Sequence, residues 1–187
     1  MQLSRFPVHD EDSAPHESRP ILRGAAGRAG ARRLPNLIGV LAGSPAVLRG
    51  FARFRAELRH GALDLATLER IALAVAEHYR CEPGLELHRR AAGGLGLARD
   101  EVALACEWDS YDDHQAALLR LLKPLVVDHE APAEHVHEEA REAGWSDAQV
   151  LEAIAYANLE AFSAMVTVAG DVPADALPKP RRDTQVA

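Results

Sequence analysis

Residues 64–80 read DLATLERIALAVAEHYR, and this stretch decides the fold class. Its apolar positions repeat with a helical period, at Leu65, Leu68, Ala72, Val75, Ala76 and Tyr79. The opposite side is apolar as well, at Ile71, Leu73 and Ala74. A helix that is apolar nearly all round is a buried one. We therefore expect a central helix here, capped at its start by Asp64.

Capping residues, glycines and prolines mark further helices around this one. We expect them over about residues 13–30, 36–43, 45–61, 83–94, 100–106, 110–124, 133–143 and 146–170. Among the signals are Ser13 as a first cap, Ser44-Pro45 as a helix start, and a capping box formed by Ser146 and Gln149. The helix over 45–61 should bury one face, made of Val47, Phe51, Phe54 and Leu58. Neither period-two alternation nor an Asn-Gly hairpin signal is present, so the fold class is all-α.

Length and composition favour one soluble domain. The chain has 187 residues and a formal net charge of −7, and basic residues never run longer than a pair. A nucleic-acid partner is therefore not expected. The longest unbroken apolar run, residues 71–76, is too short to cross a membrane. Acidic residues at 10–12 stand where a signal peptide would be apolar, which favours a cytoplasmic location.

The domain organisation follows from the same patterns. We expect an extended N-terminal segment over 1–12 and a single helical domain over 13–170. The remaining residues, 171–187, are rich in proline and charge and form a flexible or interface C-terminal tail.

Three residues near the central helix could carry chemistry. Glu69 lies among apolar neighbours, where a carboxylate loses solvation and can serve as a general acid or base. Cys81 precedes Pro83 at the start of the next helix, where backbone N–H groups favour a thiolate. His88 follows Cys81 by seven residues, about two turns, and can face the same side. The alternatives are a surface glutamate beside Arg70, a small buried cysteine, and an exposed histidine.

The spacing of these residues matches a known motif. Residues 69–88 read ERIALAVAEHYRCEPGLELH, which resembles the glutamate and C-x-x-C-x-x-x-H motif of the alkyl hydroperoxidase D-like (AhpD-like) and carboxymuconolactone decarboxylase family. Residues 34–37 and 41–45 also resemble that family, as does the late helix with Tyr156, Asn158 and Phe162. The resemblance covers roughly residues 7–175.

The resemblance implies an all-helical, AhpD-like bundle that forms a homo-oligomer, as a dimer, trimer or hexamer. In the family's peroxidase branch one cysteine attacks a peroxide and the second resolves the sulfenic acid as a disulfide, assisted by glutamate and histidine. The decarboxylase branch acts on a lactone acid without that cysteine pair. No cofactor or metal is implied.

The chain departs from the motif at Gly84, which stands where the second cysteine belongs. The usual disulfide cannot form, so an external thiol reductant would be needed. Cys106 is the only other cysteine, and either resolves Cys81 or is an ordinary core residue.

Other polar groups carry weaker signals. Histidines 129, 135 and 137 lie among glutamates. His135 and His137 are two residues apart and would face different sides of a helix, so this spacing does not favour a metal site. Residues 93–96 read GGLG without a preceding strand, and predict a helix-to-helix turn. Asn158 interrupts an apolar face and should bond a neighbouring helix or the buried glutamate.

Three functional hypotheses remain open from the sequence. The leading one is a peroxiredoxin-type, antioxidant thiol oxidoreductase in which Cys81 attacks a hydroperoxide and His88 and Glu69 move its proton. The second is a decarboxylase-type enzyme in which Glu69 and His88 act on a small carboxylated substrate, with Arg80, Arg89 or Arg90 turned inward. The third is a non-catalytic helical module.

Overall fold

The computed structural model describes residues 4–29 and 34–175, and that part of the chain contains helices and no strand. The α-helices are α1 (Arg19–Ala29), α2 (Asn36–Leu41), α3 (Pro45–Arg59), α4 (Leu65–His78), α5 (Glu82–Gly94), α6 (Arg99–Cys106), α7 (Asp113–Lys123), α8 (Glu134–Glu142) and α9 (Asp147–Ala169). A short π-helix, η1 (Pro124–Asp128), follows α7. The expected all-α fold class is confirmed.

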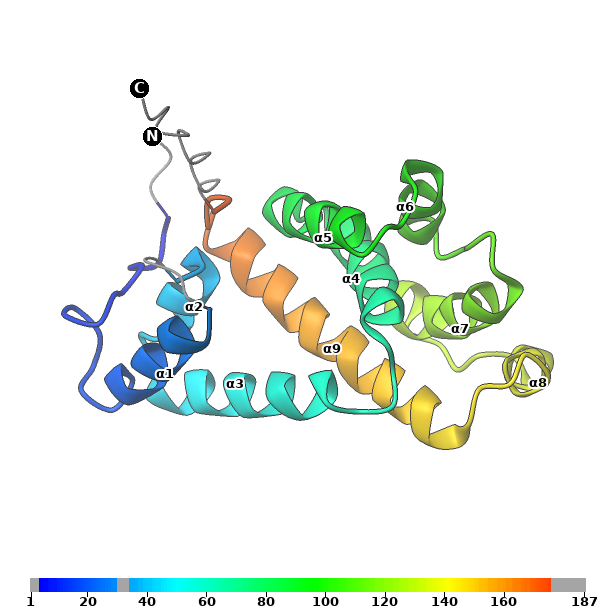
Figure 1. The fold of residues 1–187 in the computed structure, drawn as a ribbon, viewed down its shortest axis with the longest axis horizontal. Coiled ribbons are helices and arrows are strands. Elements are labelled where there is room, and N and C mark those ends of the chain that lie inside the picture. The colour runs from blue at the N-terminus through cyan, green and yellow to red at the C-terminus, as the bar shows by residue number, and fades with distance from the viewer. Residues whose placement is uncertain (1–3, 30–33, 176–187) are drawn as a thin grey trace, which may run out of the picture.

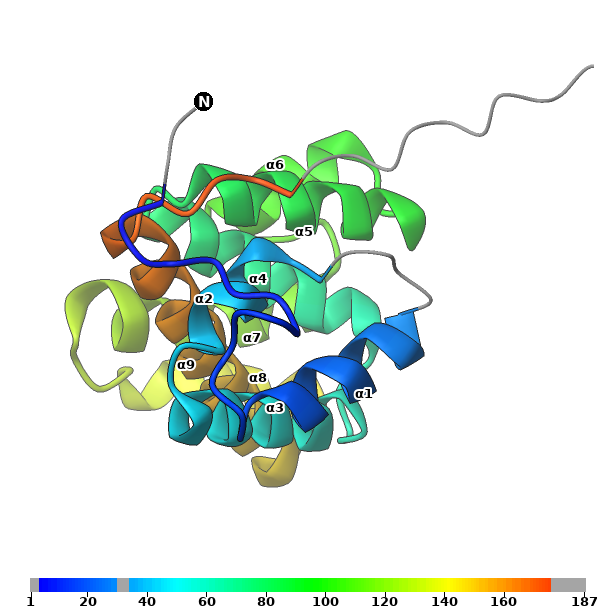
Figure 2. The ribbon, with the colours of Figure 1, turned by 90° about the vertical axis from the view of Figure 1, so that its left-hand side faces the viewer.

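Helix α4 forms the centre of the molecule. Residues 71–76 are all buried, as the all-round apolar pattern predicted, and α4 packs mainly on α5, α6 and α9. The long α9 crosses the molecule beside α4, while α3 runs along one edge and α5 lies toward the opposite one (Figure 1). The view turned by 90° shows the N-terminal segment passing over α2 (Figure 2). Because α4 contacts three helices at once, its side chains are fixed from several directions.

Two of the expected helix starts are confirmed by their capping bonds. The Asp64 carboxylate accepts a hydrogen bond from the Thr67 backbone N–H at 2.7 Å. Ser146 and Gln149 form the reciprocal capping box at the start of α9. These bonds satisfy N–H groups that a helix start otherwise leaves unpaired.

Two other helix starts were wrong, because a nearby carboxylate takes the serine hydroxyl that was expected to cap. Helix α1 begins at Arg19 rather than Ser13, whose hydroxyl donates to Asp10 at 2.7 Å. Helix α7 begins at Asp113 rather than Ser110, whose hydroxyl donates to Glu101 at 2.5 Å. The expected end of the first helix, Gly30, lies outside the described residues.

The expected buried face of α3 was partly wrong. Phe51 and Leu58 are buried, but Val47 and Phe54 are exposed, and Leu48 is buried instead. The contact with α9, where the Phe51 ring meets Phe162 at a centroid distance of 6.0 Å, sets the orientation of α3. The apolar positions of α3 alone do not define one face.

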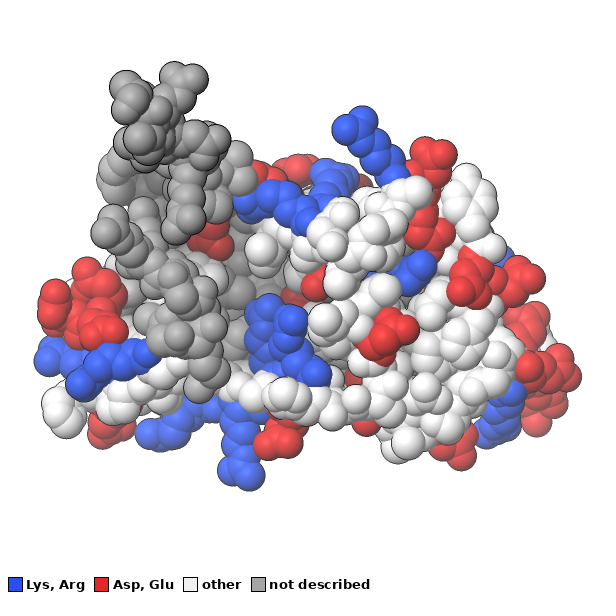
Figure 3. Space-filling model, in the orientation of Figure 1, with Lys and Arg blue, Asp and Glu red and all other residues white. Residues whose placement is uncertain are grey.

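The surface shown in Figure 3 carries charges of both signs, with acidic side chains gathered at the end formed by α8. Exposed glutamates 134, 138, 139 and 142 lie on that helix. Within residues 4–29 and 34–175, no helix is both long and apolar enough to span a bilayer.

Candidate active site

The Cys81 side chain is fixed at the junction of α4 and α5. Arg80 adopts a left-handed conformation (φ 50°), which turns the chain after α4, and the Cys81 N–H donates to the Ala76 carbonyl at 2.9 Å. Cys81 is then the residue before α5, with Pro83 in the first turn. Its side chain is only 2% exposed, so the position at a helix start was predicted correctly and the thiol is buried as well.

Burial raises the pKa of the Cys81 thiol above its ordinary value. Hydrogen bonds from the Gly84 backbone and the Thr167 side chain act in the opposite direction without cancelling it. The expectation that a helix start favours the thiolate was therefore incomplete, because loss of solvation outweighs the donors at the start of α5.

His88 lies between two carboxylates. Its Nδ1 is 2.7 Å from Glu69 Oε2, and its Nε2 is 3.5 Å from Glu160 Oε2. All three side chains are buried, and they come from α5, α4 and α9 respectively. The alternatives of a surface glutamate and an exposed histidine are excluded by this geometry.

Glu160 is the residue that sequence reasoning missed. It is 5% exposed in the middle of α9, with apolar neighbours along the helix. A charged residue in such a segment is rarely buried unless it is paired, and that signal was available in the sequence. Nothing in the spacing of Glu160 linked it to His88, which lies 72 residues earlier in the chain.

The two carboxylates hold a proton on His88. Burial would lower its pKa, but hydrogen bonds and charge from Glu160 and Glu69 raise the pKa of His88 to about 9. Burial likewise favours a high pKa for Glu160, yet the hydrogen bond and charge of His88 lower the pKa of that carboxyl. At neutral pH the arrangement is an imidazolium ion between two carboxylates, and His88 is poised to donate a proton.

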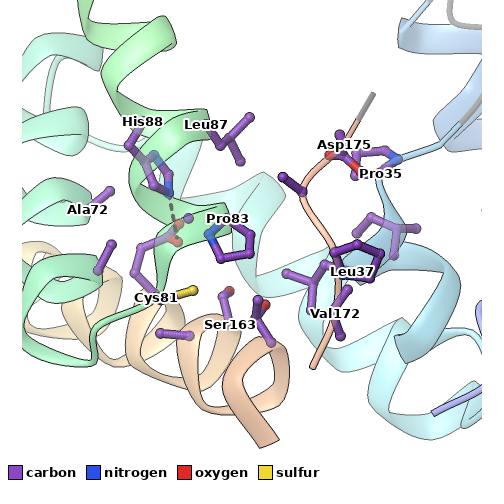
Figure 4. A pocket seen from close by; sticks show the side chains of 18 of the residues that line it. Pro35, Leu37, Ala72, Cys81, Pro83, Leu87, His88, Ser163, Val172 and Asp175 are labelled. Atoms are coloured by element: carbon purple, nitrogen blue, oxygen red, sulfur yellow. Dashed lines mark ion pairs between the residues drawn. The ribbon is translucent and has the colours of Figure 1, made fainter. Parts of the chain in front are cut away.

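Cys81, His88 and Glu160 line one cavity of about 300 Å³. Figure 4 shows the sulfur and the imidazole on one side of it and Leu37, Val172 and Asp175 across from them. Most of the lining is apolar, and Arg55 is the one Lys or Arg among the described lining residues. Glu69 is not among them, because it lies behind His88 and contacts its other ring nitrogen.

The sequence model of the carboxymuconolactone decarboxylase family matches residues 45–127. The matched segment is similar to that family over somewhat less than half of the chain. It includes Glu69, Cys81 and His88 but not Glu160. The resemblance inferred from the motif is confirmed.

Solved structures extend the likeness to most of the fold. A peroxidase-related protein of Ralstonia eutropha JMP134, described as an alkylhydroperoxidase AhpD core, is 23% identical with a TM-score of 0.76 over 94% of each chain. A peroxidase-related protein of Silicibacter sp. TM1040 is 17% identical with a TM-score of 0.78 over 94% of each chain. The debrominase Bmp8, with a cysteine changed to alanine and in complex with 2,3,4-tribromopyrrole, is 18% identical with a TM-score of 0.74 over 94% of each chain. At these identities the likeness establishes the fold, and no curated protein matches the sequence detectably.

The structure places Gly84 where the second cysteine of the family motif would meet Cys81. A Cβ atom built on Gly84 would lie 3.1 Å from the Cys81 sulfur. Cys106 does not line the Cys81 cavity but a separate one, with Glu77 and Arg89. Both thiols are free, and burial raises the pKa of Cys106 as well.

The weaker candidates lie away from this site. His129 and His135 are exposed, and no group of three metal-binding side chains occurs within the described ranges. Asn158 is exposed and its amide donates to Ile154 of its own helix at 2.8 Å, so its expected bond to another helix or to the buried glutamate was wrong. Arginines 80, 89 and 90 are exposed and do not line the Cys81 cavity.

Proposed function

We propose that the protein is a thiol oxidoreductase that reduces hydroperoxides through Cys81. One observation supports this proposal above the others. A buried thiol, a protonated imidazole and a carboxylate share an apolar cavity large enough for a small organic molecule. Such a site offers a nucleophile and a proton donor on the same bound substrate.

In the proposed reaction the Cys81 thiolate attacks the terminal oxygen of the hydroperoxide. A sulfur–oxygen bond forms, the oxygen–oxygen bond breaks, and the departing alkoxide takes a proton from His88. The proton released by Cys81 passes through Glu160 or water and restores the imidazolium. The products are a sulfenic acid on Cys81 and an alcohol, so the peroxide is reduced by two electrons and the sulfur is oxidised by two.

The motif predicts that His88 moves the thiol proton, and we propose a different role for it. A histidine whose pKa is about 9 already carries its proton at neutral pH and is a poor acceptor for the thiol proton. We assign it the general-acid role, with Glu69 positioning the ring through Nδ1. The raised pKa of Cys81 limits the thiolate fraction but gives a thiolate of higher intrinsic nucleophilicity.

Regeneration requires a thiol from outside the chain, because Gly84 supplies no resolving sulfur. One external thiol would condense with the sulfenic acid, releasing water, and a second would release Cys81 and leave with the first as a disulfide. We also propose that the protein works in the cytosol as a homo-oligomer, with residues 13–170 as its helical domain.

A second candidate is acid–base chemistry on a small carboxylated substrate, with His88 as acid and Cys81 as a bystander. Arg55 favours it, because this cation lines the cavity and could pair with a substrate carboxylate. This candidate also predicted an inward-facing arginine at position 80, 89 or 90. All three arginines are exposed, so they do not support it.

The test treats the reduced protein with an organic hydroperoxide and traps sulfenic acid with dimedone, followed by mass spectrometry of the peptides. We expect one dimedone adduct on Cys81, also in a Cys106→Ser variant. An unmodified Cys81 beside a modified Cys106 contradicts the proposal. A Cys81→Ser variant that keeps full turnover of a carboxylated substrate would decide for the second candidate.

A further inference from the structure

One polar atom of the site has no hydrogen-bond partner in the part of the chain that the structure describes. Glu160 Oε1 is buried and accepts no hydrogen bond from the described residues, whereas Oε2 of the same carboxylate lies 3.5 Å from His88 Nε2. Glu160 is 5% exposed, so bulk water does not solvate it. An ionised oxygen left in this state is costly, because the lost hydration is not replaced.

A molecule bound in the cavity is placed to supply the missing donor. The nearby side chains are already engaged or cannot supply it: the Ser163 hydroxyl donates to the Leu159 carbonyl at 2.9 Å, and the Thr167 hydroxyl bonds the Cys81 sulfur. Besides His88, the charge of Arg55 and a hydrogen bond from Tyr156 lower the pKa of Glu160, but neither of these two side chains meets Oε1 in hydrogen-bonding geometry. Because Glu160 lines the cavity, a molecule bound there can complete its coordination.

We propose that Glu160 Oε1 is a specificity-determining acceptor that selects neutral ligands with one O–H or N–H donor on an apolar body. The apolar lining accommodates the body, and the carboxylate accepts the donor in a charge-assisted hydrogen bond. This rests on the proposed function only in taking the Cys81 cavity as the substrate site. A hydroperoxide fits the class, since its terminal oxygen, the atom that sulfur attacks, carries the O–H.

The same residue disfavours anionic ligands. A ligand carboxylate beside Glu160 would meet a like charge in a poorly solvated site. His88 offers little relief, because its positive charge is already shared between Glu69 and Glu160. Arg55 is the one remaining cation that lines the cavity in the described structure, and the test below measures its competing effect.

The test uses three unreactive probes of similar size with the reduced wild-type protein. They are 2-phenyl-2-propanol, its methyl ether, and 2-methyl-2-phenylpropanoate, and their dissociation constants are measured by calorimetry at pH 7. The alcohol carries the donor, the ether lacks it, and the third is an anion. We expect the alcohol to bind about tenfold or more tighter than the ether, and the anion to bind weakest.

Variants assign the preference to Glu160. Glu160→Leu should reduce the alcohol-to-ether ratio to about one, and Glu160→Gln should weaken it, since a neutral acceptor forms a weaker bond. Ser163→Ala is the matched control one turn along α9, and it should keep the wild-type ratio. Thermal unfolding of each variant shows whether the site is still folded, and Glu160→Gln carries the test if Glu160→Leu does not fold.

Equal binding of the alcohol and the ether to the wild type overturns the proposal, because Oε1 then takes its donor from water or Tyr156. Tightest binding of the anion also overturns it and assigns specificity to Arg55. Neither result bears on whether hydroperoxide oxidises Cys81, because the dimedone experiment measures that separately. Conversely, the protein could prefer ligands with a donor through Glu160 while Cys81 fails to react with hydroperoxide. That result would support this inference and contradict the proposed peroxidase activity.

Discussion

His88 contacts Glu69 through one ring nitrogen and Glu160 through the other, and this pairing fixes both its charge and its orientation. The sequence predicted that Glu69 and His88 act together beside Cys81, since both belong to one motif, but it specified no contact between them. It did not predict the contact with Glu160, because the two helices meet only through the tertiary packing of α9 on α4 and α5. The proposed role of His88 as a proton donor rests on that third residue.

The protonation of His88 should be visible in solution. The imidazole Cε1–H signal of His88, followed by NMR with ¹³C-labelled histidine, should titrate near pH 9. The physical reason is the pair of carboxylates that stabilise the charged ring. A His88→Gln variant assigns the signal, and a midpoint near 6.5 would contradict the paired geometry.

The same pKa predicts how stability depends on pH. The pKa of His88 is raised from about 6.5 in the unfolded chain to about 9 in the folded protein. Its stabilising contribution is complete below pH 6.5 and is lost as pH rises from 6.5 to 9. We expect the free energy of unfolding, measured with urea, to fall over that window, and a contribution from His88 that is constant across the window would refute the assignment.

A cysteine at position 84 should allow Cys81 to form a disulfide. A Gly84→Cys variant should form a disulfide with Cys81 on mild oxidation, because the new Cβ would lie 3.1 Å from the sulfur, close to the roughly 3 Å of a real disulfide. Intact mass spectrometry should show a loss of two hydrogens and protection of Cys81 from alkylation. The control is Gly93→Cys, whose Cβ would meet nothing within 4 Å and which should leave Cys81 free.

At the scale of elements, helices with local signals were predicted well and those that depend on tertiary contacts were not. The buried character of α4 and the capping of α4 and α9 follow from local sequence, and each was confirmed. The starts of α1 and α7 depended on which partner a serine hydroxyl would choose, Asp10 and Glu101, and local patterns do not specify that.

Helix capping gives a matched pair of variants. Asp64→Ala should lower the free energy of unfolding by about 1 kcal/mol, since the carboxylate accepts the Thr67 N–H at the start of α4. Ser44→Ala should change it little, because Ser44 occupies the same position before α3 but makes no side-chain capping bond. Urea unfolding of both variants checks this, and equal losses would show that the capping bond of Asp64 contributes nothing.

At the scale of the whole molecule, the cavity joins segments that are far apart in the chain. Residues 34–38 and 172–175 form the wall opposite Cys81, and Asp175 holds them together by accepting the Asn36 backbone N–H at 2.7 Å. No pattern in the sequence connects these segments, so the cavity could not be predicted. The expectation of a flexible or interface tail over 171–187 stays a prediction, since 176–187 lie outside the described residues.

This wall should control access to the thiol. Asp175→Ala removes the carboxylate that accepts the Asn36 backbone N–H and leaves the Asn36 amide donating to the carbonyl oxygens of Pro173 and Ala174. We expect this weakened contact to make Cys81 react several-fold faster with N-ethylmaleimide, measured by peptide mass spectrometry. Cys106 is an internal control in the same sample, because it lines a different cavity and its rate should not change. Unchanged labelling of Cys81 would mean that reagents reach the sulfur by another path.

The most direct test of the central claim is the rate constant for oxidation of Cys81 by cumene hydroperoxide in the wild type and in His88→Gln. The account predicts a fall of about 100-fold or more in the variant, because general acid catalysis contributes roughly that much and glutamine cannot replace the imidazolium. The slow oxidation of Cys106 should be equal in both proteins. Rate constants for Cys81 within twofold of each other would contradict the account.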